Sequence, residues 1–528
     1  MNIYSRMAVL LLFLTLGTPA EGQDHPASPE HLGKVDFRNS CSPAVQTMFR
    51  NGVAMLHSFR YAETAKTFRE VLVQDPSCAI ATWGIAAILM DNPLAAVGPS
   101  PERADQAQKA IEQGRRIGAK TPRERDYIEA IAAYYEDWAN RPEAARQQAR
   151  AKAFEALAAR YPDDDDAQIF YALYLAATQS LADPTYATYL KAAAILEKQF
   201  AKHPDHPGVV HYLIHAYDAQ PIAQKGLLAA RRYADIAPSA PHALHMPSHI
   251  FTRVGAWTDS AATNKRAALA ATSDHDADQQ LHAMDYMTYA YLQMARDDDA
   301  RRVVEEAAQV SGTILFAGPY AFAAIPARYA IERGDWRSAA NLEAITTKFV
   351  FPDAMRYFAR ALGAARSGDP ASAERDVQQL ATLRDALKAA KNDYWATEVE
   401  VSRLGGAAWI ALARGKEEEA LRLMRSAADI EGKSEKHIVT PGRLVPAREL
   451  LGELLLELKR PVDALEAFEM SQTREPDRFR GLYGAAQAAA QSGDIAKAKR
   501  YFARLSEIAG QGDPRPELVE ARRFLNAH

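Results

Sequence analysis

Residues 464–502 read ALEAFEMSQTREPDRFRGLYGAAQAAAQSGDIAKAKRYF, and this stretch decides the fold. Ala464 and Phe468 recur as Ala498 and Phe502, a shift of about 34 residues that matches a known repeat period. Pro476 lies twelve positions after Ala464, and nearer the middle of the chain Pro204 recurs as Pro238 at the same shift. A fixed period of this length is the signature of a repeat protein, in which each unit needs its neighbours to bury its apolar face.

The repeating unit is predicted to be a pair of antiparallel helices. Beyond about residue 40 the chain is rich in alanine, and its apolar residues are spaced three and four apart, which is typical of helices. Short breakers recur between these stretches, for example at residues 334–336, 368–369 and 493–494. Because each breaker holds a glycine and is followed by another amphipathic stretch, we interpret them as turns within helix pairs.

The period and the Ala-x3-Phe pattern followed by proline resemble the tetratricopeptide repeat (TPR) family over about residues 43–510. The resemblance implies an all-α solenoid, a superhelix of about ten antiparallel helix pairs with a concave groove. The chain departs from the family through insertions at residues 92–103, 181–188 and 273–279. Three segments are similar to those of a subgroup of exported bacterial TPR proteins: residues 56–59, 242–251 and 440–451. This similarity implies a fold and a cellular compartment, but no activity.

Composition narrows the possible partners. Of the 528 residues, 48% are hydrophobic and 25% are charged, which is typical of a folded globular chain. Lys and Arg total 63 against 67 for Asp and Glu, a net charge of -4. Binding to a nucleic-acid backbone or to an anionic membrane usually requires an excess of positive charge, which this chain lacks. We therefore expect no nucleic-acid partner.

The N-terminus is predicted to direct export. Arg6 precedes an apolar run at residues 7–17, and small residues follow at 18–20, as in a secretory signal peptide spanning residues 1–20. The alternative is an uncleaved anchor. We expect a periplasmic or extracellular protein with no membrane span after cleavage. A polar segment (21–42), N-terminal and central repeats (43–310) and C-terminal repeats (311–528) are predicted to follow.

Cys41 and Cys78 are the only cysteines, and both lie in the portion predicted to be exported. They flank a predicted helix pair, whose two outer ends meet because the helices are antiparallel. Thiols in an exported protein are usually oxidised, so we expect a Cys41–Cys78 disulfide. Two separate thiols are the alternative.

The histidines are clustered. Nine of the fourteen lie within residues 203–282. His211 and His215 are one helical turn apart, and His245 and His249 repeat the pair one period later in the chain. Asp218 and His242 extend these helix faces by a turn. With an insertion of six residues, the next repeat aligns His282, Asp285 and Tyr289 with His242, His245 and His249.

In the TPR family the first helix of each pair lines the groove, so these offsets imply one histidine-rich concavity. Imidazole and carboxylate groups suit Zn, Cu, Ni or Fe better than Ca or Mg. We therefore expect a transition metal at His211, His215, His245 and His249. Contacts to a protein, peptide or small-molecule ligand are expected at Asp218, His242, His282, Asp285, Tyr289 and Arg328.

Other interpretations remain open on the sequence. If a helix begins at Pro247, His242 and His245 belong to the preceding loop. The groove histidines can also serve structure alone, by hydrogen bonding to one another and to tyrosines. An interaction scaffold of the cell envelope without catalysis is the main alternative function. A catalytic metal centre and a metal store fit the sequence as well, and packing is favoured for the distant His57 and His437.

Overall fold

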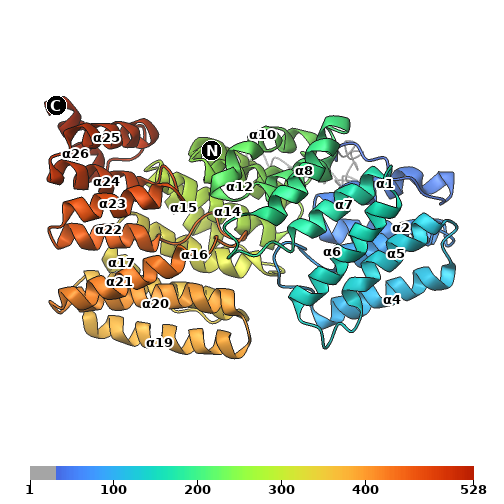
Figure 1. The fold of residues 1–528 in the computed structure, drawn as a ribbon, viewed down its shortest axis with the longest axis horizontal. Helices are drawn as coiled ribbons and strands as arrows, with labels where there is room; N and C mark the ends of the chain where they lie inside the picture. The colour runs from blue at the N-terminus through green and yellow to red at the C-terminus, as the bar shows by residue number, and fades with distance from the viewer. Residues whose placement is uncertain (1–30) are drawn as a thin grey trace, which may run out of the picture.

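The computed structural model describes residues 31–528, and all regular secondary structure in that range is helical (Figure 1). The predicted all-α fold is therefore confirmed. The signal peptide predicted at residues 1–20 lies outside the described residues, as does the first part of the segment predicted at 21–42.

The elements of the N-terminal half are η1 (Pro43–Val45), α1 (Gln46–His57), α2 (Tyr61–Gln74), α3 (Ala81–Leu89), α4 (Pro101–Ile117), α5 (Pro122–Tyr135), α6 (Glu143–Arg160), α7 (Asp165–Ala176), α8 (Ala187–Lys202), α9 (Pro207–Ala216), η2 (Gln220–Gly226), α10 (Leu227–Ile236), α11 (Pro241–His245), α12 (Pro247–Arg253) and α13 (Trp257–Ser273). Those of the C-terminal half are α14 (Ala277–Gln293), α15 (Asp297–Ala307), α16 (Ala317–Glu332), α17 (Trp336–Ala340), α18 (Val350–Arg366), α19 (Pro370–Ala389), α20 (Asp393–Ala413), α21 (Glu417–Glu431), α22 (Ala447–Glu457), α23 (Pro461–Gln472), α24 (Phe479–Ser492), α25 (Ile495–Ala509) and α26 (Pro516–Ala527).

The helices stack in chain order. Each packs mainly on the next helix and often on the next but one, as α1, α2 and α3 do at one end and α22, α23 and α24 at the other. In Figure 1 the chain runs from α1 (blue) to α26 (red) along the long axis of the molecule. Contacts of this nearest-neighbour kind define a TPR-like α-solenoid, which confirms the predicted fold class.

The Ala-x3-Phe pattern has a clear packing role. Phe468 of α23 fills the space between Gly452 of α22 and Gly484 of α24, and Cβ atoms built on these glycines would lie 2.7 and 2.2 Å from its ring. Phe68 of α2 lies between Gly52 and Gly84 in the same way, at 3.0 and 2.3 Å. In both places the glycines stand at the same spacing before and after the phenylalanine. The same steric lock thus joins helices at both ends of the solenoid.

The chain before α1 is part of the core. Cys41 and Cys78 form a disulfide with a Cα–Cα distance of 4.8 Å, as predicted. Just before it, Phe37 is buried, and its ring lies 5.1 Å from that of Trp83 and 5.2 Å from that of Tyr127. Residues 31–42 therefore close the first repeat instead of forming only a polar extension.

One connection leaves the repeat pattern. Residues 432–446, between α21 and α22, reach the N-terminal half of the chain; we call them the crossing segment. The Glu435 amide donates to the Leu181 carbonyl at 2.8 Å, and the His437 Nε2 atom lies 3.1 Å from the Ala95 carbonyl oxygen. These carbonyls belong to two of the three insertions found in the sequence, 92–103 and 181–188, so these two insertions contact the crossing segment.

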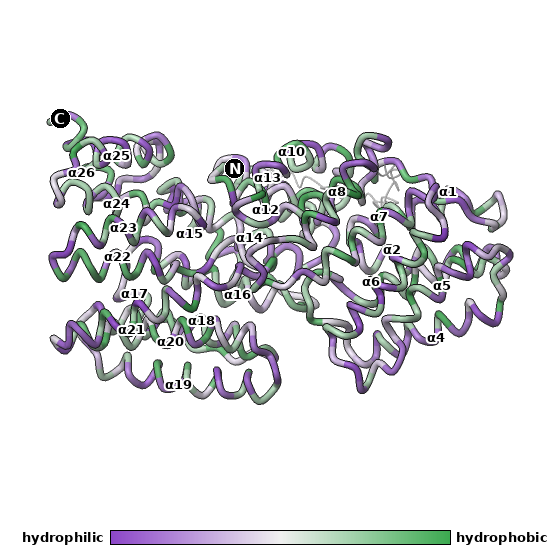
Figure 2. The backbone as a smooth tube through the Cα atoms, viewed as in Figure 1, coloured by the Kyte–Doolittle hydropathy of each residue, from purple (hydrophilic) through white to green (hydrophobic). Residues whose placement is uncertain are grey.

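Hydropathy alternates along the individual helices, as the mixed green and purple tube in Figure 2 shows. Most helices thus have one face for the core and one for solvent, whereas every residue of α3 and of α9 is buried. Within residues 31–528, no helix combines the length and the apolar character needed to cross a lipid bilayer.

The lock around Phe468 generates a first prediction. Gly484→Ala should lower the free energy of unfolding by about 1–3 kcal/mol, because the new methyl group overlaps the Phe468 ring. Gly405→Ala is the matched control within a helix: its Cβ would meet its nearest atom at 3.5 Å, so it should be neutral or stabilise by up to about 1 kcal/mol. Urea unfolding of both variants checks this, and equal midpoints would contradict the lock.

Candidate metal centre

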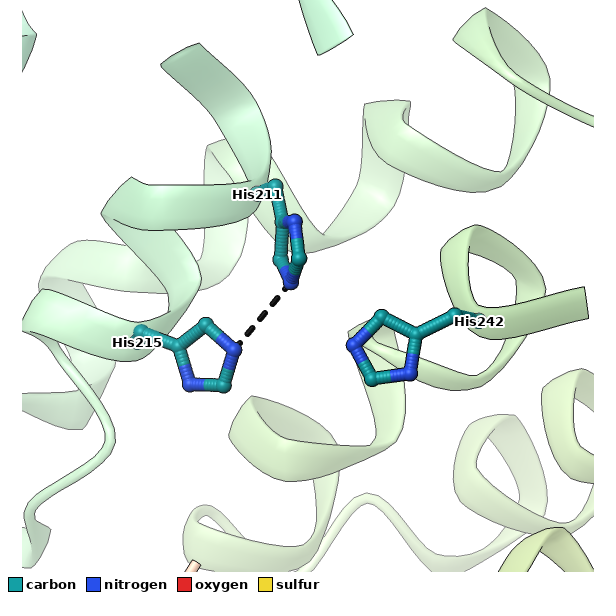
Figure 3. Close-up of side chains that lie close together, drawn as sticks. All are labelled: His211, His215 and His242. Atoms are coloured by element: carbon teal, nitrogen blue, oxygen red, sulfur yellow. Dashed lines mark hydrogen bonds between the residues drawn. The ribbon is translucent and has the colours of Figure 1, made fainter. Parts of the chain in front are cut away.

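Six buried histidines form two groups of three in the central repeats. The first triad is His211 and His215 of α9 with His242 of α11. The second triad is His245 of α11, His249 of α12 and His282 of α14. In each triad one ring nitrogen per residue lies within 4.8 Å of the other two. Figure 3 shows the first triad, with the three rings turned toward a common point.

The local backbone keeps the second pair of histidines in helical register. Only Met246 separates α11 from α12, and its φ and ψ of -53° and -37° are helical. Pro247 cannot donate the helical hydrogen bond, so the helix is interrupted, but the path of the chain continues. His242 and His245 therefore lie on a short helix and not in a loop, and His245 remains one turn from His249.

Hydrogen bonds fix the tautomers of His245 and His249. The His245 Nδ1 atom lies 2.7 Å from Asn264 Oδ1. That oxygen is identified because the Asn264 amide nitrogen donates to the Ser260 carbonyl at 2.7 Å. The His249 Nδ1 atom lies 2.8 Å from Asp218 Oδ2. Oxygens of these kinds accept hydrogen bonds, so both imidazoles carry their proton on Nδ1 and present a lone pair on Nε2.

The two lone pairs face each other. The Nε2 atoms of His245 and His249 are only 3.1 Å apart, yet neither neutral ring has a proton there to donate. An imidazolium would relieve the repulsion, but burial lowers the pKa of His249 despite the nearby Asp218 carboxylate. Burial and the neighbouring His282 hold the pKa of His245 well below 6.5. At neutral pH both rings are therefore neutral, and their Nε2 lone pairs face each other.

The first triad is similar but less constrained. His211 donates from Nδ1 to the His57 carbonyl at 2.6 Å, so its lone pair is also on Nε2, 3.1 Å from the Nε2 atom of His215 (Figure 3). Without a metal, His215 can donate from Nε2 to this lone pair, because its buried Nδ1 has no hydrogen-bond partner within residues 31–528. The Nε2 atom of His242 also lacks a partner in this range. This triad therefore offers three lone pairs once His215 adopts the Nδ1-protonated form.

Asp218 orients the second triad. Its Oδ2 atom accepts from His249 and its Oδ1 atom accepts from Arg253 Nε at 2.8 Å. Burial alone would raise its pKa, but the charges of Lys436 and Arg253 hold that pKa well below the ordinary value. Arg253 in turn donates to Glu435 of the crossing segment at 2.9 Å. Asp218 therefore orients the His249 imidazole directly, and Arg253 and Glu435 hold Asp218 in place.

Three other residues expected in the groove belong to buried polar networks, and one of them, Arg328, holds the crossing segment. Arg328 donates to Asp285 and to the Gly442 carbonyl, both at 2.7 Å. The Tyr289 hydroxyl oxygen accepts from Arg478 at 2.6 Å. Among residues 31–528, Asp285, Tyr289 and Arg328 stand outside the cavity wall described next.

Both triads border one cavity of about 550 Å³ with mostly apolar walls. His215 and His242 of the first triad and His249 and His282 of the second line it. Burial raises the pKa of two lining carboxyls, Asp91 and Asp278, to about 6. The remaining lining residues include Tyr61, Arg103, Gln279, Phe316, Phe349, Ile438 and Val439. A small molecule in this cavity would meet both groups of imidazoles.

The sequence analysis missed several residues of the site. The Tyr286 ring lies 4.7 Å from that of His245, and its hydroxyl donates to crossing-segment carbonyls at 3.1 Å. Asn264 fixes one tautomer, and Gln279 lies 3.1 Å from Nδ1 of His242. Tyr286 stands one helical turn after His282, a spacing that could have indicated it. Asn264 lies on a second helix of a pair and had no such signal.

Comparisons with known proteins assign no family. The sequence matches no family model and no curated protein. Among solved structures, the chain is similar to the human IFIT1 dimer with PPP-AAAA (12% identity, TM-score 0.40, 89% of this chain and 95% of that chain). It is also similar to the human IFIT1 dimer with m7Gppp-AAAA, at 13% identity and a TM-score of 0.37, over 80% of this chain and 90% of that chain. A third similar structure is the APC/C hetero-tetramer Cut9-Hcn1, at 11% identity and a TM-score of 0.32, over 91% of this chain and 89% of that chain. Identities and TM-scores this low assign no function.

The crossing segment generates a second prediction. Burial lowers the pKa of His437 from 6.5 to about 4, and the neutral ring accepts from the Val439 amide at 3.2 Å. Because the folded pKa is depressed, this ring's contribution to stability is complete above pH 6.5 and is lost as the pH falls toward 4. The loss should reach up to about 3 kcal/mol.

His437→Gln removes this titration while keeping an amide donor for the Ala95 carbonyl. The difference in unfolding free energy between the native chain and the variant should therefore shrink on acidification from pH 7 to pH 4. Denaturant unfolding with a chelator present measures it. A difference that stays constant over this range would contradict the assignment of a neutral, buried His437.

Proposed function

We propose that this protein binds transition-metal ions at the wall of its central cavity, one in each histidine triad. The observation that supports this most strongly is the meeting of the Nε2 atoms of His245 and His249 at 3.1 Å, with both Nδ1 protons committed to oxygen acceptors. A divalent ion between the two lone pairs turns a repulsive contact into two favourable bonds.

The distances and the surroundings both suit a metal site. Nitrogens that share a tetrahedral Zn²⁺ at about 2.0–2.1 Å lie roughly 3.4 Å apart, close to the 3.1 Å found in both triads. Metal-ligating histidines typically donate their other N–H group to a carboxylate or carbonyl. His249 does so to Asp218, and His211 does so to the His57 carbonyl.

The ligand set indicates the class of metal. Neutral imidazoles favour Zn, Cu, Ni or Fe, whereas Ca and Mg require oxygen ligands. The depressed pKa values keep the rings neutral and able to bind a metal near neutral pH. A divalent ion held by three imidazoles keeps a position open and acts there as a Lewis acid on water or a ligand oxygen.

The cavity favours a small molecule over a peptide as the second ligand. In a TPR-like scaffold a peptide would lie along the concave groove, but here the crossing segment lies across the central repeats. Its Glu435, Lys436 and His437 side chains are buried there. A peptide would have to displace Arg253–Glu435 and the other ion pairs, whereas a small molecule fits the 550 Å³ cavity beside the triads.

Elemental analysis of protein purified without a metal-binding tag tests the proposal. His249→Asn should contain one transition-metal ion fewer per chain than the native protein, and His215→Asn/His249→Asn two fewer. Asparagine suits position 249 because its amide can still donate to Asp218 while the Nε2 ligand is lost. His203→Asn, in a partly exposed histidine hydrogen-bonded to Asp165, is the matched control and should change nothing.

Circular dichroism should show unchanged helicity in all these variants. Native protein that takes up no Zn²⁺, Cu²⁺, Ni²⁺ or Fe²⁺ after loading would contradict the proposal. Equal metal content in the native chain and the folded double variant would contradict it as well.

A further inference from the structure

A third cluster of metal-ligating side chains lies outside the central cavity. His57 is the last residue of α1, Asp166 lies in the first turn of α7, and His206 is the N-cap of α9. The Asp166 Oδ1 atom lies 3.9 Å from His57 Nε2 and 3.6 Å from His206 Nε2. The three residues are at most 6% exposed.

These polar atoms converge without bonding to one another. His57 Nε2, Asp166 Oδ1 and both ring nitrogens of His206 are buried, and within the described part of the chain none has a hydrogen-bond partner. Separations of 3.6 and 3.9 Å are too long for hydrogen bonds. Each buried polar atom left unpaired costs about 1–3 kcal/mol, so a cluster of unpaired atoms contributed by three residues requires an explanation.

The surroundings hold the His57 ring firmly in place. Its Nδ1 atom lies 2.8 Å from the Tyr212 hydroxyl oxygen, and its ring stacks on Phe170 with centroids 4.5 Å apart. Gly208 makes room for it, because a Cβ atom there would lie 2.3 Å from His57 Nδ1. The oxygen beside Nδ1 leaves Nε2 for a metal, the arrangement usual for metal-binding histidines.

The cluster borders a surface cavity. Asp166 and His206 line a second cavity of about 760 Å³ on the surface between the N-terminal repeats. Asp163, Asp164 and Asp165 line the same cavity, which places carboxylates along the approach to the cluster. A cation in this cavity would therefore lie beside the buried ligand atoms of the cluster.

We infer that His57, Asp166 and His206 form a further metal site, separate from the two triads, that takes a divalent transition ion such as Zn²⁺ or Fe²⁺. Two imidazoles and one carboxylate are an established donor set for both ions. The ligand atoms lie somewhat farther apart than the roughly 3.4 Å of a tetrahedral Zn²⁺ site, so binding draws them slightly inward. The ion would satisfy three of the four unpaired atoms at once.

Such a site would link segments that are distant in sequence. It joins the end of α1 to the beginnings of α7 and α9, which belong to three different helix pairs. The His57 carbonyl also accepts the Nδ1 proton of His211 at 2.6 Å. An ion on the His57 side chain would therefore steady the backbone group that sets the tautomer of the first triad, and it should raise the melting temperature of the whole chain.

Zinc titration of a variant lacking both central sites tests this inference independently of the proposed function. His215→Asn/His249→Asn should still bind one Zn²⁺ per chain in calorimetry. Adding His206→Asn should abolish that binding. Asparagine is a favoured N-cap residue, so this change preserves the start of α9. His203→Asn on the same background is the matched control and should keep the ion.

The possible outcomes distinguish the further site from the proposed function of the two triads. A central-site variant that is folded but binds no Zn²⁺ overturns this inference and leaves the triads untouched. Retention of the ion after both His206→Asn and Asp166→Asn overturns it too. A further check needs no substitution. Crystals of the native chain soaked in Zn²⁺ should give an anomalous-difference peak between His57, Asp166 and His206. Ordinary water density there, without an anomalous signal, would contradict the site.

Discussion

The structure around the central cavity depends on one constraint: buried imidazoles whose Nδ1 protons are already committed to oxygen acceptors. Asn264 and Asp218 fix His245 and His249 in this way, so that two lone pairs meet inside the protein. Much of the neighbouring polar network serves that arrangement. Arg253 keeps Asp218 ionised and links it to Glu435, and Tyr286 donates to crossing-segment carbonyls while packing against both rings.

The repeat architecture explains how two such groups come to stand side by side. A helix places residues four apart on one face, and the repeat period places the same face of the next repeat beside it. The His215 and His249 rings are one period apart in the sequence, and their centroids are therefore only 5.6 Å apart. Two of the insertions contact the crossing segment, and the wall of the cavity beside these rings includes residues of both the 92–103 insertion and the crossing segment. Repetition supplies the ligands, and the irregular segments enclose the site.

Much of this could be predicted from the sequence because it depends on local spacing. The Ala-x3-Phe period predicted the solenoid, since Phe468 and its two glycines act within neighbouring helices. The spacing of His211, His215, His245 and His249 likewise placed them on one surface. The roles of Asp285 and Arg328 could not be predicted, because they depend on a loop that is distant in the sequence. The cluster of His57, Asp166 and His206 also depends on long-range packing, and the sequence favoured a packing role for His57.

The most direct test of the account is the protonation state of His245 and His249 in the metal-free protein. Nitrogen-15 NMR with labelled histidine, assigned through single His→Asn variants, distinguishes the two neutral tautomers. The account predicts that at pH 7.5 both rings carry the proton on Nδ1, and that both Nε2 signals shift when Zn²⁺ is added. A proton on Nε2 of either ring would make their contact an ordinary hydrogen bond, and the argument for a metal between them would fail.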